Sequence, residues 1–134
     1  MQYLGMDVHA TWTVWCLVDA QGEVLREGQV RTTATALTAL VQALSQAGEV
    51  LAGQEVGTLT SLVHDAVTAA GTTLLSCNAQ HLRMIAPSRK KIDRRDAYWI
   101  AKALQSGRYP HPVYIPTGAA SQKNDNPANF PASL

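Results

Sequence analysis

The stretch MQYLGMDVH, residues 1–9, is the starting point for interpreting the fold, because it places a charged residue, Asp7, inside an apolar strand pattern. The run QYLGMDV predicts a short buried strand over residues 2–8. Asp7 lies near the end of this strand. A buried carboxylate costs several kcal/mol unless it is paired or binds a ligand. Asp7 therefore predicts either a partner inside the fold or a bound ion such as a metal.

The next two segments predict a hairpin. TWTVWCLVDA, residues 11–20, alternates as a strand. One of its faces carries Trp12, Val14, Cys16 and Val18, and the other carries Trp15 and Leu17. Apolar residues on both faces indicate a central strand that is covered on both sides. AQGE, residues 20–23, signals a turn, and VLREGQVRT, residues 24–32, predicts the return strand at a sheet edge.

Helices and strands alternate in the rest of the pattern. Helices are predicted over 32–48, with Thr32 or Thr33 as the cap, over 59–71 and over 93–107, each closed by a glycine. Strands are predicted over 50–57, ending near Glu55, and over 72–77. A short helical segment (78–87), a basic loop (88–92) and a last strand (111–116) complete the pattern. The order predicts a mixed α/β sheet that begins with a three-stranded antiparallel meander and has helices on both faces.

The composition predicts one globular domain with a local basic region. Of the 134 residues, 46% are apolar and 16% charged, and the net charge of +1 gives no overall sign of nucleic acid or membrane binding. Six of the eleven Lys and Arg residues nevertheless lie between residues 83 and 95. We expect an ordered domain over 1–116 and a polar tail over 117–134 that is disordered or truncated.

The cysteines and the absence of a membrane pattern predict a cytoplasmic protein. Cys16 and Cys77 each lie in an apolar run, with no metal-ligand or disulfide spacing, and are expected to be reduced core residues. No apolar run reaches the roughly 18 residues of a membrane span. The N-terminus carries no export signal.

Four carboxylates occupy positions that suggest a metal site: Asp7, Glu55, Asp93 and Asp96. Ligands of open α/β sheets bind at the carboxyl ends of strands, where Glu55 is expected. Asp7 lies beside Glu55 if the first and fourth strands are neighbours, and the last helix can bring Asp93 and Asp96 over them. Oxygen ligands suit Mg²⁺ or Mn²⁺, and a pair of such ions can cleave a phosphodiester.

Structural roles are the alternative for each acid. Asp93 can cap a helix, and Asp96 can favour its first turn. Glu55 can simply end a strand, and Asp7 can bond to a turn. His9 is equally compatible with a metal ligand, a phosphate contact or an ordinary strand-end histidine. The ordered set of four acids favours the metal site over these separate explanations.

The set resembles a known family. GMDVHA, QEVG and KIDRRDA before YWIAKAL are similar to the motifs of DEDD insertion-sequence transposases, the relatives of the Piv invertase that include bridge-RNA-guided recombinases. The resemblance spans about residues 3–116 and includes VDAQGEVL and NAQHLRMIAPSRKK. Two departures are Ala10, where the family usually has Lys, and Val56, where Thr is expected, with a spacing to Gly57 shorter by one residue.

The resemblance implies an RNase H-like, RuvC-like domain with a DEDD motif. Its catalytic and metal-binding residues would be Asp7, Glu55, Asp93 and Asp96, with Mg²⁺ or Mn²⁺ as cofactor. The implied function is DNA strand cleavage and transfer in transposition. A separate C-terminal domain of the family supplies a serine, so this chain alone is not expected to recombine DNA. DNA, a guide RNA and further copies of the full-length protein are the implied partners.

Basic residues flank the last two acids. They are Arg89, Lys90, Lys91, Arg94 and Arg95, and we expect them to contact nucleic acid phosphates, although a solvated loop is the alternative. Tyr98 or Trp99 can stack on a base, with a core role favoured for at least one of them. Two other functions stay open: a nucleic-acid-binding module without catalysis, and a fragment of an actin-like or sugar-kinase ATPase. The second lacks the glycine-rich phosphate loop that it needs.

Overall fold

The computed structural model describes residues 1–78, 93–109 and 112. Its elements are β1 (Gln2–Val8), β2 (Trp12–Val18), β3 (Val24–Arg31), α1 (Ala34–Leu44), a 3₁₀ turn (Ser45–Ala47), β4 (Val50–Glu55), α2 (Thr60–Ala69), β5 (Thr73–Cys77) and α4 (Asp93–Ser106). Within these residues the predicted order is confirmed. Apart from Asn78 and Pro112, the predicted segments 78–87, 88–92 and 111–116 and the tail 117–134 lie outside the described residues.

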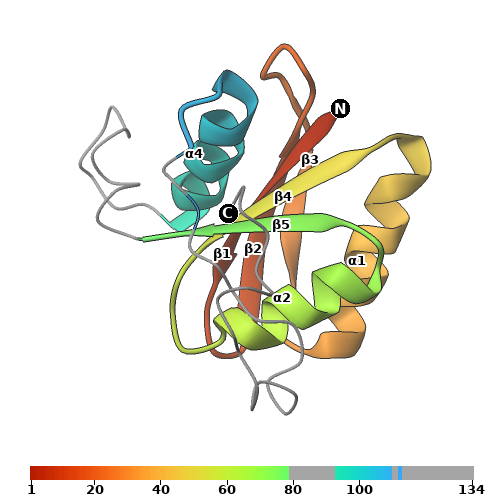
Figure 1. Cartoon of the computed structure of the whole chain (residues 1–134), viewed down its shortest axis with the longest axis vertical. Coiled ribbons are helices and arrows are strands. Elements are labelled where there is room, and N and C mark those ends of the chain that lie inside the picture. Colours follow the sequence, from red (N-terminus) through yellow and green to blue (C-terminus); the bar gives the residue numbers. More distant parts are fainter. Residues whose placement is uncertain (79–92, 110–111, 113–134) are drawn as a thin grey trace, which may run out of the picture.

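The five strands form one mixed sheet in the order β3-β2-β1-β4-β5. β1, β2 and β3 are the predicted antiparallel meander, whereas β4 runs parallel to β1 and β5 runs parallel to β4. α1 and α2 cover one face of the sheet, and α4 covers the other (Figure 1). The predicted mixed α/β sheet with helices on both faces is therefore confirmed.

The face under α1 and α2 holds the larger apolar core. Leu37, Val41 and Leu44 recur along one side of α1 and are buried against Leu4 and Met6 of β1. α1 starts where the Thr33 hydroxyl accepts a hydrogen bond from the Ala36 amide at 3.1 Å, which selects Thr33 from the two predicted caps. Because the chain tightens into a 3₁₀ turn after Leu44, α1 ends before the predicted boundary at residue 48.

α4 lies directly on the backbone of the sheet at two glycines. Gly5 of β1 and Gly53 of β4 are partners in the parallel register. A β-carbon on Gly5 would collide with the Ala97 carbonyl oxygen and lie 2.6 Å from the Ala101 nitrogen. Glycine at residue 5 is therefore what lets the α4 backbone approach β1 so closely.

Hydrogen bonds to the β2–β3 turn fix the direction of α4. Near the end of the helix, Gln105 Nε2 donates to the Ala20 carbonyl at 2.9 Å and Lys102 Nζ donates to the Gly22 carbonyl at 3.4 Å. This turn lies beside the start of β1, because Tyr3 pairs with Val18. α4 therefore runs opposite to β1, and its first turn lies toward the carboxyl end of β1, as Figure 1 shows.

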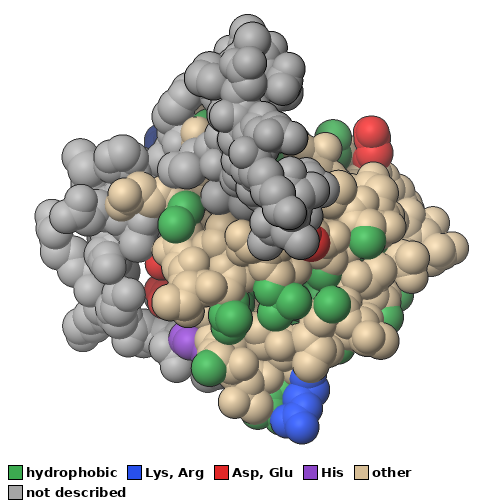
Figure 2. Space-filling model, turned by 60° about the horizontal axis from the view of Figure 1, so that its bottom comes forward, with side chains coloured by type: hydrophobic (Ala, Val, Ile, Leu, Met, Phe, Trp, Pro, Cys, Tyr) green, Lys and Arg blue, Asp and Glu red, His purple; other side chains and the backbone are tan. Residues whose placement is uncertain are grey.

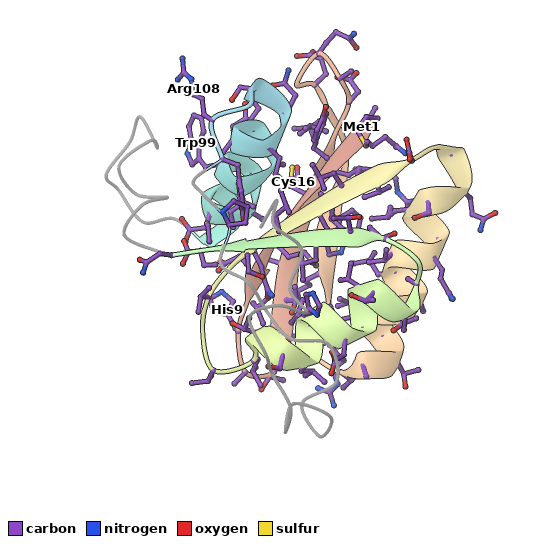
Figure 3. The ribbon with its side chains drawn as sticks, viewed as in Figure 1. Met1, His9, Cys16, Trp99 and Arg108 are labelled. Atoms are coloured by element: carbon purple, nitrogen blue, oxygen red, sulfur yellow. The ribbon has the colours of Figure 1, made fainter. Side chains whose placement is uncertain are left out.

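β2 confirms the predicted division of faces but not the predicted cover. Cys16 and Val18 pack under α4, while Trp15 and Leu17 join the core under α1 and α2. Cys16 lies between the sheet and α4 in Figure 3. Trp12, at the start of the strand, is 42% exposed, so the expected cover on both sides does not extend to this residue.

The two cysteines are buried and free, as predicted. Tyr98 packs against the Cys16 and Val18 cluster, which confirms a core role for one of the two adjacent aromatic residues; its ring meets that of Trp99 edge to face at 5.0 Å. Within the described part of the chain, no helix has the length and apolar character to cross a membrane.

Candidate metal and nucleic-acid site

Asp7 and Glu55 are neighbours at the carboxyl ends of two parallel strands. Met6 of β1 is the register partner of Gln54 of β4, and the two acids follow these residues directly. The condition on which the sequence argument depended, that the first and fourth strands are neighbours, is thereby met. Side chains alternate along a strand, so Asp7 shares a face with Gly5, and Glu55 shares a face with Gly53. Both acids therefore lie on the face of the sheet that α4 covers.

A hollow of about 140 Å³ opens at this end of the sheet, and both acids line it. The rest of its wall comes mainly from the loop between β4 and α2. Thr60 fixes this loop, because its hydroxyl donates to the Gly57 carbonyl at 2.7 Å and accepts from the Gly57 amide at 2.6 Å. The loop is also tied to β5 through a bond of 2.8 Å from the Val56 amide to the Cys77 carbonyl. In Figure 2, which brings the bottom of Figure 1 forward, acidic and histidine side chains lie near one another at the left edge of the described surface.

Gln54 is a buried polar residue at the hollow that sequence reasoning missed. Its side chain is fully buried, and Nε2 donates to the Thr60 carbonyl at 3.3 Å and to Ser76 Oγ at 3.1 Å. These two hydrogen bonds hold Gln54, the residue directly before Glu55, to α2 and β5. The available signal was a single amide inside the apolar run VLAGQ, because such a buried group requires partners.

His9 contacts Asp7 directly. Its Nε2 lies 3.0 Å from Asp7 Oδ2, and the Asp7 side chain is 15% exposed against 48% for His9. The turn that carries His9 is well fixed: its amide donates to the Trp12 carbonyl at 3.0 Å, and its carbonyl accepts from the Thr32 hydroxyl at 2.7 Å. This geometry lets His9 orient the Asp7 carboxylate. His9 lies beside the end of β1 in Figure 3.

Tyr109 holds the strand ends on the Glu55 side. Its hydroxyl lies 2.8 Å from both the Gln54 and the Leu75 carbonyl oxygens. Burial raises the pKa of this hydroxyl, and Cys77 and the Glu55 carboxylate act in the same direction. The pKa of Cys77 is raised by burial first and also by Glu55. The carboxylate of Glu55 is therefore close enough to both groups to oppose a second negative charge.

The third and fourth acids lie at the start of α4. Asp93 is the first residue of the helix, and its side chain is outside the described part. Asp96 is partly buried and precedes Ile100 and Ala103 by four and seven positions, on the side of α4 that packs against β4 and β5. Among the side chains that the structure describes, no three His, Cys, Asp or Glu residues form a metal-binding group.

The basic residues are only partly described. Arg94 and Arg95 lie in the first turn of α4, with their side chains outside the described part. Arg89, Lys90 and Lys91 also lie outside the described residues. The backbone nevertheless places the start of α4, residues 93–97 (DRRDA), at the end of the sheet where Asp7 and Glu55 lie.

The donor set fits a hard divalent cation. Asp7 and Glu55 supply carboxylate oxygens from adjacent strands, and oxygen is the ligand that Mg²⁺ and Mn²⁺ prefer. Two carboxylates on neighbouring strand ends repel each other, and a cation between them would remove that repulsion. The cysteines do not belong to the set, because Cys16 and Cys77 are buried in apolar clusters.

Known structures and sequences place this geometry in context. Thermus thermophilus RuvC is similar to the chain with a TM-score of 0.59 at 14% identity, over 81% of this chain and 96% of that chain. RuvC from the same organism in complex with a Holliday junction substrate gives a TM-score of 0.58 at 14% identity, over 81% and 97%. These similarities show a RuvC-like, RNase H-like fold. No curated protein sequence matches the chain. The family model for DEDD transposases of the IS110 type matches residues 4–122, and the chain therefore belongs to this transposase family.

Proposed function

We propose that this chain is the metal-dependent catalytic domain of a DEDD transposase, in which Asp7, Glu55, Asp93 and Asp96 bind Mg²⁺ or Mn²⁺ for DNA strand cleavage and transfer. The observation that carries the proposal is the position of Asp7 and Glu55. They lie side by side at the carboxyl ends of β1 and β4, on one hollow and on the face covered by α4. A structural role for either acid alone does not account for that pairing.

Each residue has a defined task in this proposal. Bound divalent ions would activate the attacking oxygen and stabilise the leaving oxygen of a phosphodiester. Asp7 and Glu55 hold the sheet side of the site, and the first turn of α4 supplies Asp93 and Asp96. His9 keeps the Asp7 carboxylate in one orientation through the 3.0 Å contact. Gln54 and Tyr109 hold the strand end that carries Glu55.

DNA is the proposed substrate. The family is one of transposases, and RuvC, which shares the fold, has been solved with a Holliday junction substrate. Arg89, Lys90, Lys91, Arg94 and Arg95 would hold the phosphates next to the acids, with an affinity that falls as salt rises. A C-terminal serine-bearing domain, a guide RNA and assembly into oligomers belong to the proposal for the full-length protein.

Metal binding by the four acids can be measured on the chain itself. Calorimetric titration with Mn²⁺ should show binding by the wild type and a loss of about tenfold or more in affinity for Asp7→Asn and Glu55→Gln. Glu49→Gln is the matched control, because Glu49 is exposed at the opposite end of β4. Equal affinity of Asp7→Asn and wild type, or no binding by the wild type at millimolar Mn²⁺, would leave a nucleic-acid-binding module without catalysis as the better description.

A further inference from the structure

Trp12 is an exposed aromatic residue on the same face of the sheet as Asp7. Residues 12, 14, 16 and 18 of β2 share a face, and Cys16 and Val18 pack under α4. Val14 is the cross-strand partner of Asp7, and Trp12 lies two residues further along β2. Trp12 is not part of the described cluster that Cys16 and Val18 form with α4, and its side chain is 42% exposed.

A cation lies over the Trp12 ring. The guanidinium carbon of Arg31 is 5.3 Å from the ring centroid, and the two residues are direct partners across β2 and β3. Arg31 is itself exposed. Unpaired bases stack on aromatic side chains such as an indole, and an arginine guanidinium adds a cation–π contribution. We call these two residues the Trp12–Arg31 pair.

A short and fixed path joins the Trp12–Arg31 pair to the acids. The Trp12 carbonyl accepts the amide of His9, whose ring contacts Asp7. The two-residue step from Val14 to Trp12 spans about 7 Å along a strand. That is within one or two nucleotides of a phosphate at a metal ion that Asp7 would hold, since successive nucleotides of one strand are about 3.4 Å apart along B-DNA and further apart when unstacked.

We propose that the Trp12–Arg31 pair is a stacking platform for an unpaired DNA base next to the phosphate on which metal ions held by the acids would act. The inference rests on the proposed function for its choice of DNA. The platform would hold the strand by its base, while the acids act on its backbone. It would also favour substrates with a melted or flipped base at that position over continuous duplex, because a base inside a duplex already stacks on its neighbours.

Binding of short labelled oligonucleotides tests the platform without catalysis. Fluorescence anisotropy is measured on the full 134-residue chain in EDTA. The probes are a mixed-sequence single strand, the same strand with abasic sites, the RNA of the same sequence and the duplex. The variants are Trp12→Ala, Trp12→Phe and Arg31→Ala. Leu25→Ala is the matched control, because Leu25 is equally exposed at the far end of β3.

We expect Trp12→Ala to weaken single-strand binding by about tenfold, and Trp12→Phe to restore most of it. The abasic strand should bind wild type as weakly as the normal strand binds Trp12→Ala, and Leu25→Ala should match wild type. Unchanged affinity of Trp12→Ala, equal binding of the abasic strand, tighter binding of duplex or RNA, or no binding of the single strand would each overturn the platform. Circular dichroism melting confirms that the variants are folded.

The two proposals can fail separately. Oligonucleotide binding in EDTA does not need the metal, so Asp7→Asn should keep the Trp12-dependent preference for bases. If Mn²⁺ binding fails while that preference remains, the catalytic proposal is wrong and the platform stands. If Mn²⁺ binds but Trp12→Ala changes nothing, the platform is wrong and the metal site stands.

Discussion

Replacing Gly5 by alanine tests whether α4 is seated directly on β1. The new β-carbon would meet two backbone atoms, Ala97 O and Ala101 N, and ordinary contacts begin only at 3.4 Å. A backbone cannot change rotamer, so α4 would have to move away by roughly 1 Å. Overpacking of this kind costs about 1–3 kcal/mol, and the lost glycine entropy returns about 0.5–1 kcal/mol. The difference is at most about 2.5 kcal/mol, and because both contacts are with backbone atoms we expect Gly5→Ala to lie near this upper end, at about 2 kcal/mol.

Urea unfolding followed by circular dichroism measures this loss against two graded controls. In Gly53→Ala the new β-carbon would meet only side-chain atoms, the nearest being Leu104 Cδ1 at 2.8 Å, so a loss of about 1 kcal/mol or less is expected. In Gly57→Ala no atom of the described residues lies within 4 Å of the new β-carbon, and stability should stay within about 0.5 kcal/mol of wild type. Gly5→Ala as stable as Gly57→Ala would refute the close seating of α4.

Three further predictions concern stability and are read from the same unfolding curves. Tyr109→Phe should cost about 1–2 kcal/mol, because the Gln54 and Leu75 carbonyls lose their shared hydroxyl partner; an unchanged midpoint would contradict that role. Thr33→Ala should cost about 1 kcal/mol through loss of the α1 cap, whereas Thr33→Ser should keep most of it. Burial, and to a lesser extent the Glu27 carboxylate, raises the pKa of Cys16 from 9.0 to about 11. The free energy of unfolding should therefore fall as pH rises from about 9 to about 11, and the fall should be smaller in Cys16→Ala.

The sign of the Cys16 prediction follows from proton binding. The folded thiol holds its proton more tightly than the unfolded one, so its contribution is fully present below pH 9 and is lost as pH rises through about 11. Burial raises the pKa of Cys77 and Tyr109 as well, so these groups act in the same direction. A profile of Cys16→Ala parallel to that of wild type between pH 9 and 11 would show that this thiol does not titrate with unfolding.

Much of the architecture was predictable because hydrophobic period and glycine punctuation are local signals. The strand at residues 2–8, the meander and the helices with their closing glycines follow from such patterns. The position of β4 beside β1 was only a condition of the sequence argument, because the alternation of strands and helices does not fix the order of strands in the sheet. The exposure of Trp12 was not predictable, because it depends on where α4 crosses β2. That crossing is set by contacts between segments about 80 residues apart in sequence, such as Gln105 to Ala20.

The acids of the candidate site could be predicted from the sequence, but the residues that support them could not. Asp7 and Glu55 stand out because charges at strand ends are costly without a ligand or a partner. Gln54 Nε2 and the Tyr109 hydroxyl do not stand out, since their hydrogen-bond partners are groups that only the fold brings together. Among the described side chains, Asp96 does not form a metal-binding group with Asp7 and Glu55, and the side chain of Asp93 is outside the described part, so the four-acid site stays a prediction.

The glycines and the acids form one repeated unit. Gly5 precedes Asp7 by two residues on β1, and Gly53 precedes Glu55 by two residues on β4. On the face that α4 covers, each strand therefore carries a glycine, which has no side chain, followed by a carboxylate. Since α4 runs opposite to β1, the seating of Ala97 and Ala101 on Gly5 brings the helix start toward the acids. The distance between β1 and α4 therefore depends on the absence of a β-carbon at Gly5. A site that needs oxygens from both elements at metal-ligand distance would depend on that contact as much as on the acids themselves.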